Sequence, residues 1–338
     1  MRRLQIVAYG PLRDAVQFAD VGLPSMGVTD VLIRMVAAGI NPIDYKIAAG
    51  ALRRVHTLAL PAAFGFDGSG IVEAVGASVR AFKAGDAVFV RAPRERMGSF
   101  AEYLATDQQF VAKAPFAIPL IEAASIPLVA LTTVQGLVDR AQARPGQRIL
   151  IHAGSGGLGS FAIQYAKRVL GLHVTTTTSS RNQAWVRELG ADVVIAYDEQ
   201  DYRALPARYD IVFDTLGGAA TAASFDLLNP GGVVVSVAGP PDRHFARQVH
   251  AGPVLSAILW LMGARMRQRA RAKNARYFRF LTESSGAQLE SIARLLTAGT
   301  IKAVIDQVFP FERAIEALEY AAQGRAKGKV MLQIDKAT

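Results

Sequence analysis

The length, composition and charge of the chain already exclude several classes of protein. It has 338 residues, of which 51% are hydrophobic, 30 are glycine and none is cysteine, and its formal net charge is +10. This size predicts two hydrophobic cores rather than one, and the composition excludes a disordered chain. The lack of cysteine excludes disulfides, thiolate nucleophiles and cysteine-ligated zinc, and with no apolar signal core or membrane span in view we expect a cytoplasmic protein.

The hydrophobic pattern predicts strands first and a strand–helix alternation later. Short runs such as "DVLIRMV" and "GSGIVEAVG" are separated by turn signals over the first 120 or so residues, which is typical of strands. From "RPGQRILIH" onward, apolar runs alternate with helical patterns such as "LGSFAIQYAKRVL". The strands predicted in this half are residues 148–152, 173–177, 193–195, 210–214 and 232–237.

This alternation predicts an α/β fold with right-handed crossovers and a doubly wound parallel sheet. The turn "NPGG", residues 229–232, is predicted to end a helix and to lead into the next strand. A final strand, "KVMLQI", closes the chain.

A glycine-rich turn follows the first strand of the alternating half. In "AGSGGLG", Gly154, Gly156 and Gly159 match G-x-G-x-x-G between a predicted strand and a predicted helix. We expect the first glycine to permit the tight turn, the second to let a pyrophosphate approach, and the third to let helix and strand pack closely. The phosphate would meet free amides at the helix N-terminus, including those of Gly157 and Leu158, whereas the alternative is a tight turn without a ligand.

The stretch "LHVTTTTSSRN", residues 172–182, indicates which dinucleotide would bind. NAD-binding sheets end their second strand in an acid that binds the ribose hydroxyls and repels a 2′-phosphate. No acid occurs between Gly154 and Asn182, and Ser179, Ser180 and Arg181 offer hydroxyls and a fixed cation instead. The stretch predicts an NADPH site, unless the threonines are only a strand and Arg181 is only solvated.

Taken together, these segments resemble the medium-chain dehydrogenase/reductase superfamily and, within it, the zinc-free NADPH:quinone oxidoreductase branch. The C-terminal "VIDQVFPFERAIEALEYAAQGRAKGKV" is most similar to alkenal reductases and a mitochondrial reticulon-interacting oxidoreductase. The segments that carry the resemblance are "AAGINPIDYKIAAG", "FGFDGSGIVEAVG", "FKAGDAVF", "GSFAEYL", "ALTTVQGL", "ILIHAGSGGLGSFAIQYAK", "LGADVVIAY", "DIVFDTLGG" and "GRAKGKVMLQI".

The resemblance implies two domains with a cleft at their junction. A GroES-like catalytic domain would comprise residues 1–122 and 302–338, and a Rossmann NADP-binding domain would comprise residues 123–301. We also expect a homodimer.

The resemblance also bears on metals. Zinc-dependent relatives place a cysteine near "GINPID" and a His-Glu pair near "FGFDG", whereas this chain has Asn41 and Pro42 in the first stretch and Phe66 and Asp67 in the second. The five histidines are scattered, and none lies at ligand spacing from another. We therefore expect no metal and no alcohol dehydrogenation.

Without a metal, hydrogen-bond donors must polarise the substrate carbonyl. The segment "NPIDYK" corresponds to one that faces the nicotinamide in the family, so Asn41, Asp44, Tyr45 and Lys46 are the catalytic candidates. Many relatives have tyrosine at the position of Lys46, whereas here tyrosine comes one residue earlier. The alternative is that Asn41 and Asp44 hold a turn around Pro42 and that Lys46 is solvated.

Three more residues are assigned to the cofactor by resemblance. Thr132 would contact the nicotinamide end, Tyr197 would lie beside the 2′-phosphate, and Lys329 would reach the cofactor. The alternatives are a threonine that caps a helix, an aromatic residue that ends a strand, and a lysine on a surface strand.

The expected function is NADPH-dependent transfer of hydride to a small hydrophobic quinone or to an α,β-unsaturated carbonyl. Reduction of an enoyl thioester is the alternative among enzymes. A nonenzymatic RNA-binding protein regulated by NADPH is the alternative from another class, but no RNA-binding motif with stacked aromatic residues occurs, which disfavours nucleic acid as a partner.

The excess of positive charge is mostly local. Residues 265–279 contain seven cations and no acid, and 10 − 7 leaves only +3 for the rest of the chain. On one continuous helix, Arg265, Arg269, Lys273 and Arg276 would share a face, and Ile258, Leu261 and Met262 would pack inward or border the cleft. This segment predicts either a solvated helix or a weak contact with an anionic membrane.

Overall fold

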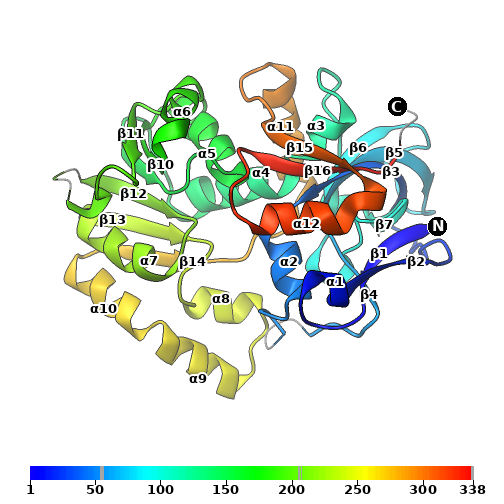
Figure 1. The fold of residues 1–338 in the computed structure, drawn as a ribbon, viewed down its shortest axis with the longest axis horizontal. Helices are drawn as coiled ribbons and strands as arrows, with labels where there is room; N and C mark the ends of the chain where they lie inside the picture. Colours follow the sequence, from blue (N-terminus) through cyan, green and yellow to red (C-terminus); the bar gives the residue numbers. More distant parts are fainter. Residues whose placement is uncertain (54–56, 205, 207, 336–338) are drawn as a thin grey trace. The chain divides into compact units, whose positions relative to one another are not determined.

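The computed structural model describes residues 1–53, 57–204, 206 and 208–335, and Figure 1 shows its fold. The chain divides into two compact units: unit 1 comprises Met1–Leu131 and Glu283–Thr338, and unit 2 comprises Thr132–Thr282. The sequence-based boundaries, after residues 122 and 301, differ from these. Residues 336–338 of the predicted catalytic domain lie outside the described residues.

Unit 1 is a β-rich body to which both halves of its discontinuous chain contribute. Its larger sheet has the order β15-β16-β3-β5-β6-β8, with β7 also paired to β3, and its smaller sheet has the order β2-β1-β4. Because β16 pairs antiparallel with β3, a C-terminal strand lies inside the sheet that the N-terminal segment builds. The strands are β1 (Arg2–Ile6), β2 (Val16–Asp20), β3 (Asp30–Ile40), β4 (Ala62–Ala63), β5 (Asp67–Val75), β6 (Ala87–Arg91), β7 (Tyr103–Asp107), β8 (Val111–Lys113), β15 (Ile305–Pro310) and β16 (Lys329–Gln333).

Short helices surround these sheets. The α-helices of unit 1 are α1 (Leu12–Ala15), α2 (Pro42–Ala48), α3 (Leu120–Ala123), α11 (Gly286–Thr297) and α12 (Ala314–Ala322), and α4 (Pro127–Val134) crosses into unit 2. The 3₁₀ turns are η1 (Arg94–Arg96), η2 (Gln108–Phe110) and η7 (Phe311–Arg313).

The packing of α11 explains why the second unit boundary lies before residue 301. This helix packs on β8 and η2 of unit 1. A Cβ atom at Gly286 would lie 2.4 Å from the carbonyl oxygen of Val111 and 2.7 Å from that of Gln109. The glycine therefore lets the start of α11 lie directly against this backbone, and the chain returns to unit 1 at Glu283.

Unit 2 is a six-stranded parallel sheet with the order β11-β10-β9-β12-β13-β14, which confirms the predicted doubly wound fold. The strands are β9 (Arg148–Ile151), β10 (His173–Thr178), β11 (Val193–Ala196), β12 (Tyr209–Asp214), β13 (Leu228–Ser236) and β14 (Arg276–Arg279). The helices and helical turns are η3 (Gln135–Arg140), α5 (Gly157–Arg168), η4 (Ser180–Asn182), α6 (Gln183–Glu188), η5 (Tyr202–Ala204), α7 (Gly218–Ser224), η6 (Phe225–Leu227), α8 (Arg243–Gln248), α9 (Pro253–Met262) and α10 (Ala264–Ala272).

The predicted turn "NPGG" is a correction, because these residues lie within β13 rather than before it. Pairing with β12 jumps from Tyr209 opposite Leu228 to Ile211 opposite Val233, so residues 229–232 bulge from the ladder. Gly231 has a φ of +81°, which glycine adopts at no steric cost.

The basic segment is a second correction, because it is not one helix. Gly263 separates α9 from α10, α10 ends at Ala272, and the chain turns at Asn274, whose φ is +48°, into β14. Arg276 therefore lies on a strand and does not share a helical face with Arg265. Within the described residues, no helix combines the length and apolar composition that crossing a bilayer requires.

Candidate active site

β9 leads into a glycine loop, residues 152–156, which opens α5. The amide of Gly154 donates a hydrogen bond to the carbonyl oxygen of Thr177 (2.9 Å), and a Cβ atom at Gly154 would lie 2.1 Å from Thr176 Oγ1. Gly154 is thus needed for close approach to β10, whereas the residue with the left-handed backbone is Ala153 (φ +54°). The tight turn at Gly154 thus needs glycine for lack of space and not for a left-handed backbone.

The other two glycines of the motif differ in what surrounds them. A Cβ atom at Gly159 would lie 2.3 Å from the carbonyl oxygen of Ala153, so helix and loop pack closely as predicted. A Cβ atom at Gly156 would have that same oxygen, at 3.5 Å, as its only described neighbour within 4 Å. Gly156 is the N-cap of α5, and no side chain caps the helix there. The first backbone amides of the helix, including those of Gly157 and Leu158, therefore suit an anion such as a pyrophosphate.

The predicted 2′-phosphate residues gather where two neighbouring strands end. Ser179, Ser180 and Arg181 follow β10, and Tyr197 follows β11, its parallel neighbour. The amide of Tyr197 donates to the carbonyl oxygen of Thr178 (3.0 Å), which fixes the two ends side by side. The side chains of Arg181 and Tyr197 are exposed.

An acid that the sequence analysis missed lies beside these residues. The amide of Ser180 donates to Oδ1 of Asp198 (2.8 Å), and its hydroxyl donates to Oδ2 (2.9 Å). These hydrogen bonds, the amide first, hold the pKa of Asp198 below its ordinary value, and Arg181 lowers it further. Residues 172–182 contain no acid, but the folded site does. Because β11 pairs with β10, Asp198 lies at the end of β10.

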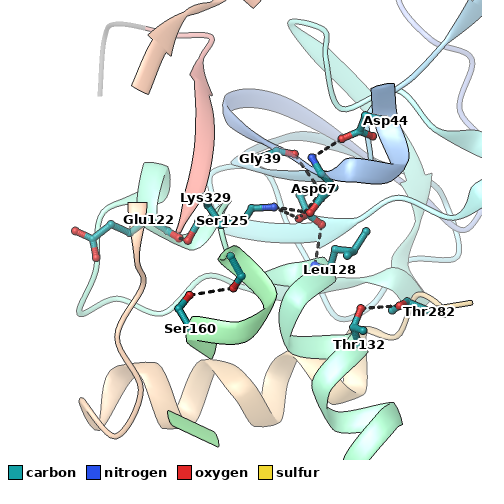
Figure 2. Close-up of polar contacts among 12 residues, drawn as sticks. Gly39, Asp44, Asp67, Glu122, Ser125, Leu128, Thr132, Ser160, Thr282 and Lys329 are labelled. Atoms are coloured by element: carbon teal, nitrogen blue, oxygen red, sulfur yellow. Dashed lines mark hydrogen bonds and ion pairs between the residues drawn. The ribbon is translucent and has the colours of Figure 1, made fainter. Parts of the chain in front are cut away.

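Thr132 lies in the part of α4 that belongs to unit 2. Its side chain is buried, and its Oγ1 lies 2.6 Å from Oγ1 of Thr282 (Figure 2). Its contact with the nicotinamide end stays a prediction.

In unit 1, Asn41, Asp67 and Lys329 form a buried polar network. Lys329 Nζ donates to Asn41 Oδ1 (2.5 Å) and lies 3.2 Å from Asp67 Oδ2, and Asn41 Nδ2 donates to the same carboxylate oxygen (2.9 Å). The amide of Leu128 donates to the other oxygen of Asp67 (2.8 Å), and Figure 2 shows Lys329 and Leu128 on either side of this carboxylate. Lys329 is only 5% exposed, which excludes the surface-strand alternative.

The sheet order explains how residues so distant in sequence meet. β3 lies between β5 and β16, Asn41 follows β3, and Asp67 and Lys329 are the first residues of the other two strands. A Cβ atom at Gly39 would lie 2.7 Å from the carbonyl oxygen of Ala124 and 3.3 Å from carbons of both Asp67 and Lys329. Glycine at this point of β3 therefore leaves room for the network.

Asp44 is a second buried carboxyl next to this network. Its Oδ2 accepts a hydrogen bond from the amide of Asn41 (2.7 Å), while its Oδ1 is buried with no hydrogen-bond partner among the described residues. Burial raises the pKa of Asp44 to about 8, although the Asn41 amide opposes the shift, and the neighbouring Asp67 adds to it. At neutral pH this carboxyl is mostly protonated.

Burial also raises the pKa of Asp67 itself, and Lys329 and Asn41 counteract that shift. In the sequence, Asp67 stood out only because it lies where zinc-dependent relatives have a His-Glu pair. The sequence shows an acid at the start of β5, but the partners of this acid come from three other segments of the chain.

The remaining residues of "NPIDYK" point elsewhere. Tyr45 is half-buried and packs against the apolar core of unit 1, and burial, with the nearby Asp44, raises the pKa of its phenol. Lys46 is on the exposed side of α2. The structure thus joins Asn41 and Asp44 through the turn around Pro42, as the alternative interpretation predicted, and the catalytic roles of all four residues stay predictions.

Arg91 is a further buried group that the sequence analysis missed. Its guanidinium lies over the ring of Phe66, 4.8 Å from the centroid, and donates from Nη1 to Ser284 Oγ (2.7 Å). Burial lowers the pKa of Arg91 to about 10, and the charges of Asp67 and Asp44 oppose that shift. In the part of the chain that the structure describes, no three histidine, aspartate or glutamate side chains are placed to hold a metal ion.

Comparison with known proteins identifies the families that the chain resembles. Residues 27–116 match the family described as alcohol dehydrogenase GroES-like domain, and residues 189–332 match the family described as zinc-binding dehydrogenase. The chain is 32% identical over 326 residues to an NADPH-dependent alkenal/one oxidoreductase, chloroplastic, of Arabidopsis thaliana, covering 93% of this chain and 74% of that protein. It is 32% identical over 335 residues to the trans-enoyl reductase pgmF of Aspergillus terreus, covering 93% of this chain and 89% of that protein.

Among solved structures, the quinone oxidoreductase from Coxiella burnetii has the same fold. The TM-score is 0.86 at 29% sequence identity, and the match covers 99% of each chain.

The raised pKa of Asp44 predicts how stability depends on pH. A carboxyl that holds its proton more tightly in the folded than in the unfolded state costs stability as pH rises from its ordinary pKa to the folded value of about 8. Asp44→Asn removes this titration, so its free energy of unfolding should gain on that of the wild type between pH 5 and pH 8.5, measured by urea denaturation.

The matched control is Asp192→Asn, whose carboxyl has the opposite shift. Partial burial opposes the shift, but the hydrogen bond from Lys167 and the amide of Val174 lower the pKa of Asp192. This control should lose stability by a constant amount over the same range. A constant difference between Asp44→Asn and the wild type would contradict the assigned pKa.

Removing one partner of the buried Lys329–Asp67 pair should greatly lower the free energy of unfolding. Lys329→Met leaves a buried carboxylate without its cation, which should cost about 3–5 kcal/mol of unfolding free energy. Adding Asp67→Asn should recover much of that loss, and Lys167→Met at the half-exposed pair with Asp192 should cost only about 0–1 kcal/mol. Equal effects of the two lysine substitutions in urea denaturation would contradict the buried pairing.

Proposed function

Because the chain belongs to the medium-chain dehydrogenase/reductase superfamily, in its quinone oxidoreductase branch, we propose that it is an NADPH-dependent reductase of quinones or α,β-unsaturated carbonyls. The observation that carries this proposal is the glycine loop of unit 2. Gly154 and Gly159 let the loop pack against β10 and α5 without side chains between them, and the first turn of α5 keeps its amides for an anion.

Different residues would bind different parts of the cofactor. The amides after Gly156 would bind the pyrophosphate, and Arg181 and Tyr197 would flank the 2′-phosphate. Thr132 would contact the nicotinamide end. By the same family resemblance, Lys329 would reach the cofactor. Bound NADPH supplies the hydride, and the protein contributes orientation and electrostatics.

Reduction of a quinone or of a conjugated double bond consumes a proton besides the hydride. We assign the storage of that proton to Asp44, whose buried carboxyl has a pKa of about 8 and an Oδ1 atom without a described partner. Asn41, held by Asp67 and Lys329, contributes an amide whose orientation is fixed from both sides. Its two N–H groups donate to Asp67 and to the carbonyl oxygen of Gly39, so Asn41 would serve to position the network next to Asp44 rather than to bind the substrate directly.

The preference between NADPH and NADH rests on two opposing charges. Arg181 favours a phosphate dianion at the end of β10, whereas the carboxylate of Asp198 disfavours it and occupies both donors of Ser180. We place NADPH first because the arginine and both serines are adjacent and because an acid at the end of β10 itself, the position that binds ribose hydroxyls, is lacking.

This balance predicts opposite effects of two substitutions. Charge-assisted hydrogen bonds contribute on the order of 2 kcal/mol, so Arg181→Ala should raise the KM for NADPH roughly tenfold or more and leave the KM for NADH nearly unchanged. Asp198→Asn keeps an acceptor for Ser180 but removes the repelling charge, so it should lower the KM for NADPH. Glu199→Gln, the same charge change at the neighbouring exposed residue, is the control. Equal KM values for both cofactors in the wild type would contradict the proposed site.

The test of the function is a panel of acceptors at matched concentrations. NADPH oxidation should be fastest with a quinone or a short enal or enone, and it should persist after exhaustive chelation because no zinc ligand set is expected. Fastest turnover with an enoyl thioester would favour the second candidate function, which the similarity to a trans-enoyl reductase supports. Stoichiometric zinc in the purified protein, or loss of activity on chelation, would contradict a metal-independent reductase.

A further inference from the structure

Helix α9 in unit 2 carries an apolar stripe that faces solvent. Val254, Ile258, Leu261 and Met262 are spaced i, i+4, i+7 and i+8, so they lie on one side of the helix. Their exposed fractions are 76%, 49%, 64% and 59%, whereas Leu259 turns inward and is 6% exposed. A stripe of this size is unusual on a surface without a binding role.

The next helix, α10, is cationic. Met266 and Ala270 bury its inner side in the core of unit 2. Its outer side and C-cap carry Arg265, Arg267, Arg269, Arg271 and Lys273, and no acid occurs anywhere in residues 243–282. Figure 1 shows α9 and α10 following each other, and Gly263 separates them in the chain. We call α9 and α10 together the α9–α10 surface.

Among the described residues of unit 2, one acid pairs with these cations. Arg269 and Lys273 share one exposed carboxylate, Asp226, at 3.3 Å and 3.8 Å. Arg265 and Arg271 are exposed. The segment that follows differs, because Arg276 and Arg279 donate to backbone carbonyls of their own unit.

Trp260 joins the apolar and the cationic parts. It is 43% exposed, and the guanidinium of Arg267 lies over its ring, 4.1 Å from the centroid, and donates to its carbonyl oxygen. Tryptophan is enriched at the boundary between lipid headgroups and hydrocarbon, where its ring is buried and its N–H group meets polar groups. A half-exposed tryptophan beside an arginine suits that boundary.

We propose that the α9–α10 surface docks on an anionic phospholipid membrane, with the stripe of α9 in the headgroup boundary and the cations of α10 against the phosphates. A bilayer surface offers both hydrocarbon and negative charge, so it complements both parts of the surface. The same surface of a second copy would offer no acid to the cations of α10, because residues 243–282 contain none. A nucleic acid offers phosphates but no hydrocarbon for Val254, Ile258, Leu261 and Met262.

The experiment is flotation of the full chain with vesicles of phosphatidylcholine alone or of phosphatidylcholine with 30% phosphatidylglycerol. The wild type should float only with the anionic vesicles and should be released by high salt. Arg265→Gln with Arg271→Gln should weaken that binding roughly tenfold or more, because each basic residue contributes. Ile258→Ser with Leu261→Ser should weaken it as well. In a Trp185→Phe background, where Trp260 is the one remaining tryptophan, the fluorescence should shift to the blue only with anionic vesicles.

The matched control is Arg144→Gln with Arg187→Gln, the same charge change at exposed positions elsewhere in unit 2. This control should bind vesicles like the wild type, and all three variants should keep wild-type circular dichroism and NADPH oxidation, which shows that they fold. Equal flotation of the control and the α10 variant, or equal flotation with both kinds of vesicle, would overturn the proposal.

Two further outcomes would show that the α9–α10 surface binds another partner. If Ile258→Ser with Leu261→Ser dissociates an oligomer in sedimentation velocity and leaves vesicle binding unchanged, the stripe is a contact between copies. If a single-stranded RNA oligonucleotide binds wild type and stripe variant equally and prevents flotation of the wild type, the cations serve nucleic acid. Either result overturns docking by the combined surface.

Discussion

The buried carboxylate of Asp67 is the constraint on which the architecture of unit 1 depends. An ionised carboxyl away from water is stable only when donors surround it, and here a lysine, a side-chain amide and a backbone amide converge on it. These donors come from the start of β16, the residue after β3 and the start of α4. The network therefore requires β16, β3 and β5 to be neighbours, which is their order in the sheet. The lack of a side chain at Gly39 makes the close approach feasible.

Two aspartates in different surroundings give the two units different chemistry. Asp44 is removed from water and stays protonated near neutral pH, whereas Asp198 accepts two hydrogen bonds at the surface and stays ionised. The same side chain is therefore mostly neutral at pH 7 in one unit and negatively charged in the other. Environment, rather than residue type, sets the charge of each carboxyl.

The sequence predicted what depends on local pattern. The parallel sheet and the glycine loop follow from hydrophobic periodicity and from glycines placed between a strand and a helix, and both are present. What it missed depends on pairing between distant segments: Asp198 reaches Ser180 because β10 and β11 are neighbours, and Lys329 reaches Asp67 through β3. The bulge of residues 229–232 and the breaks at Gly263 and Asn274 were missed because a tight turn and a strand irregularity have the same composition.

The discontinuity of unit 1 also has a consequence for the order of events on the ribosome. Unit 2 is one continuous segment, so all of its strands are synthesised before β16 exists. The first 131 residues, in contrast, hold Asp67 and an open edge of β3 until Lys329 and its strand emerge. During that interval the carboxylate is paired by water, and the sheet edge is free to bind other chains or chaperones. Unit 1 can therefore complete its larger sheet only after the whole of unit 2 has been synthesised.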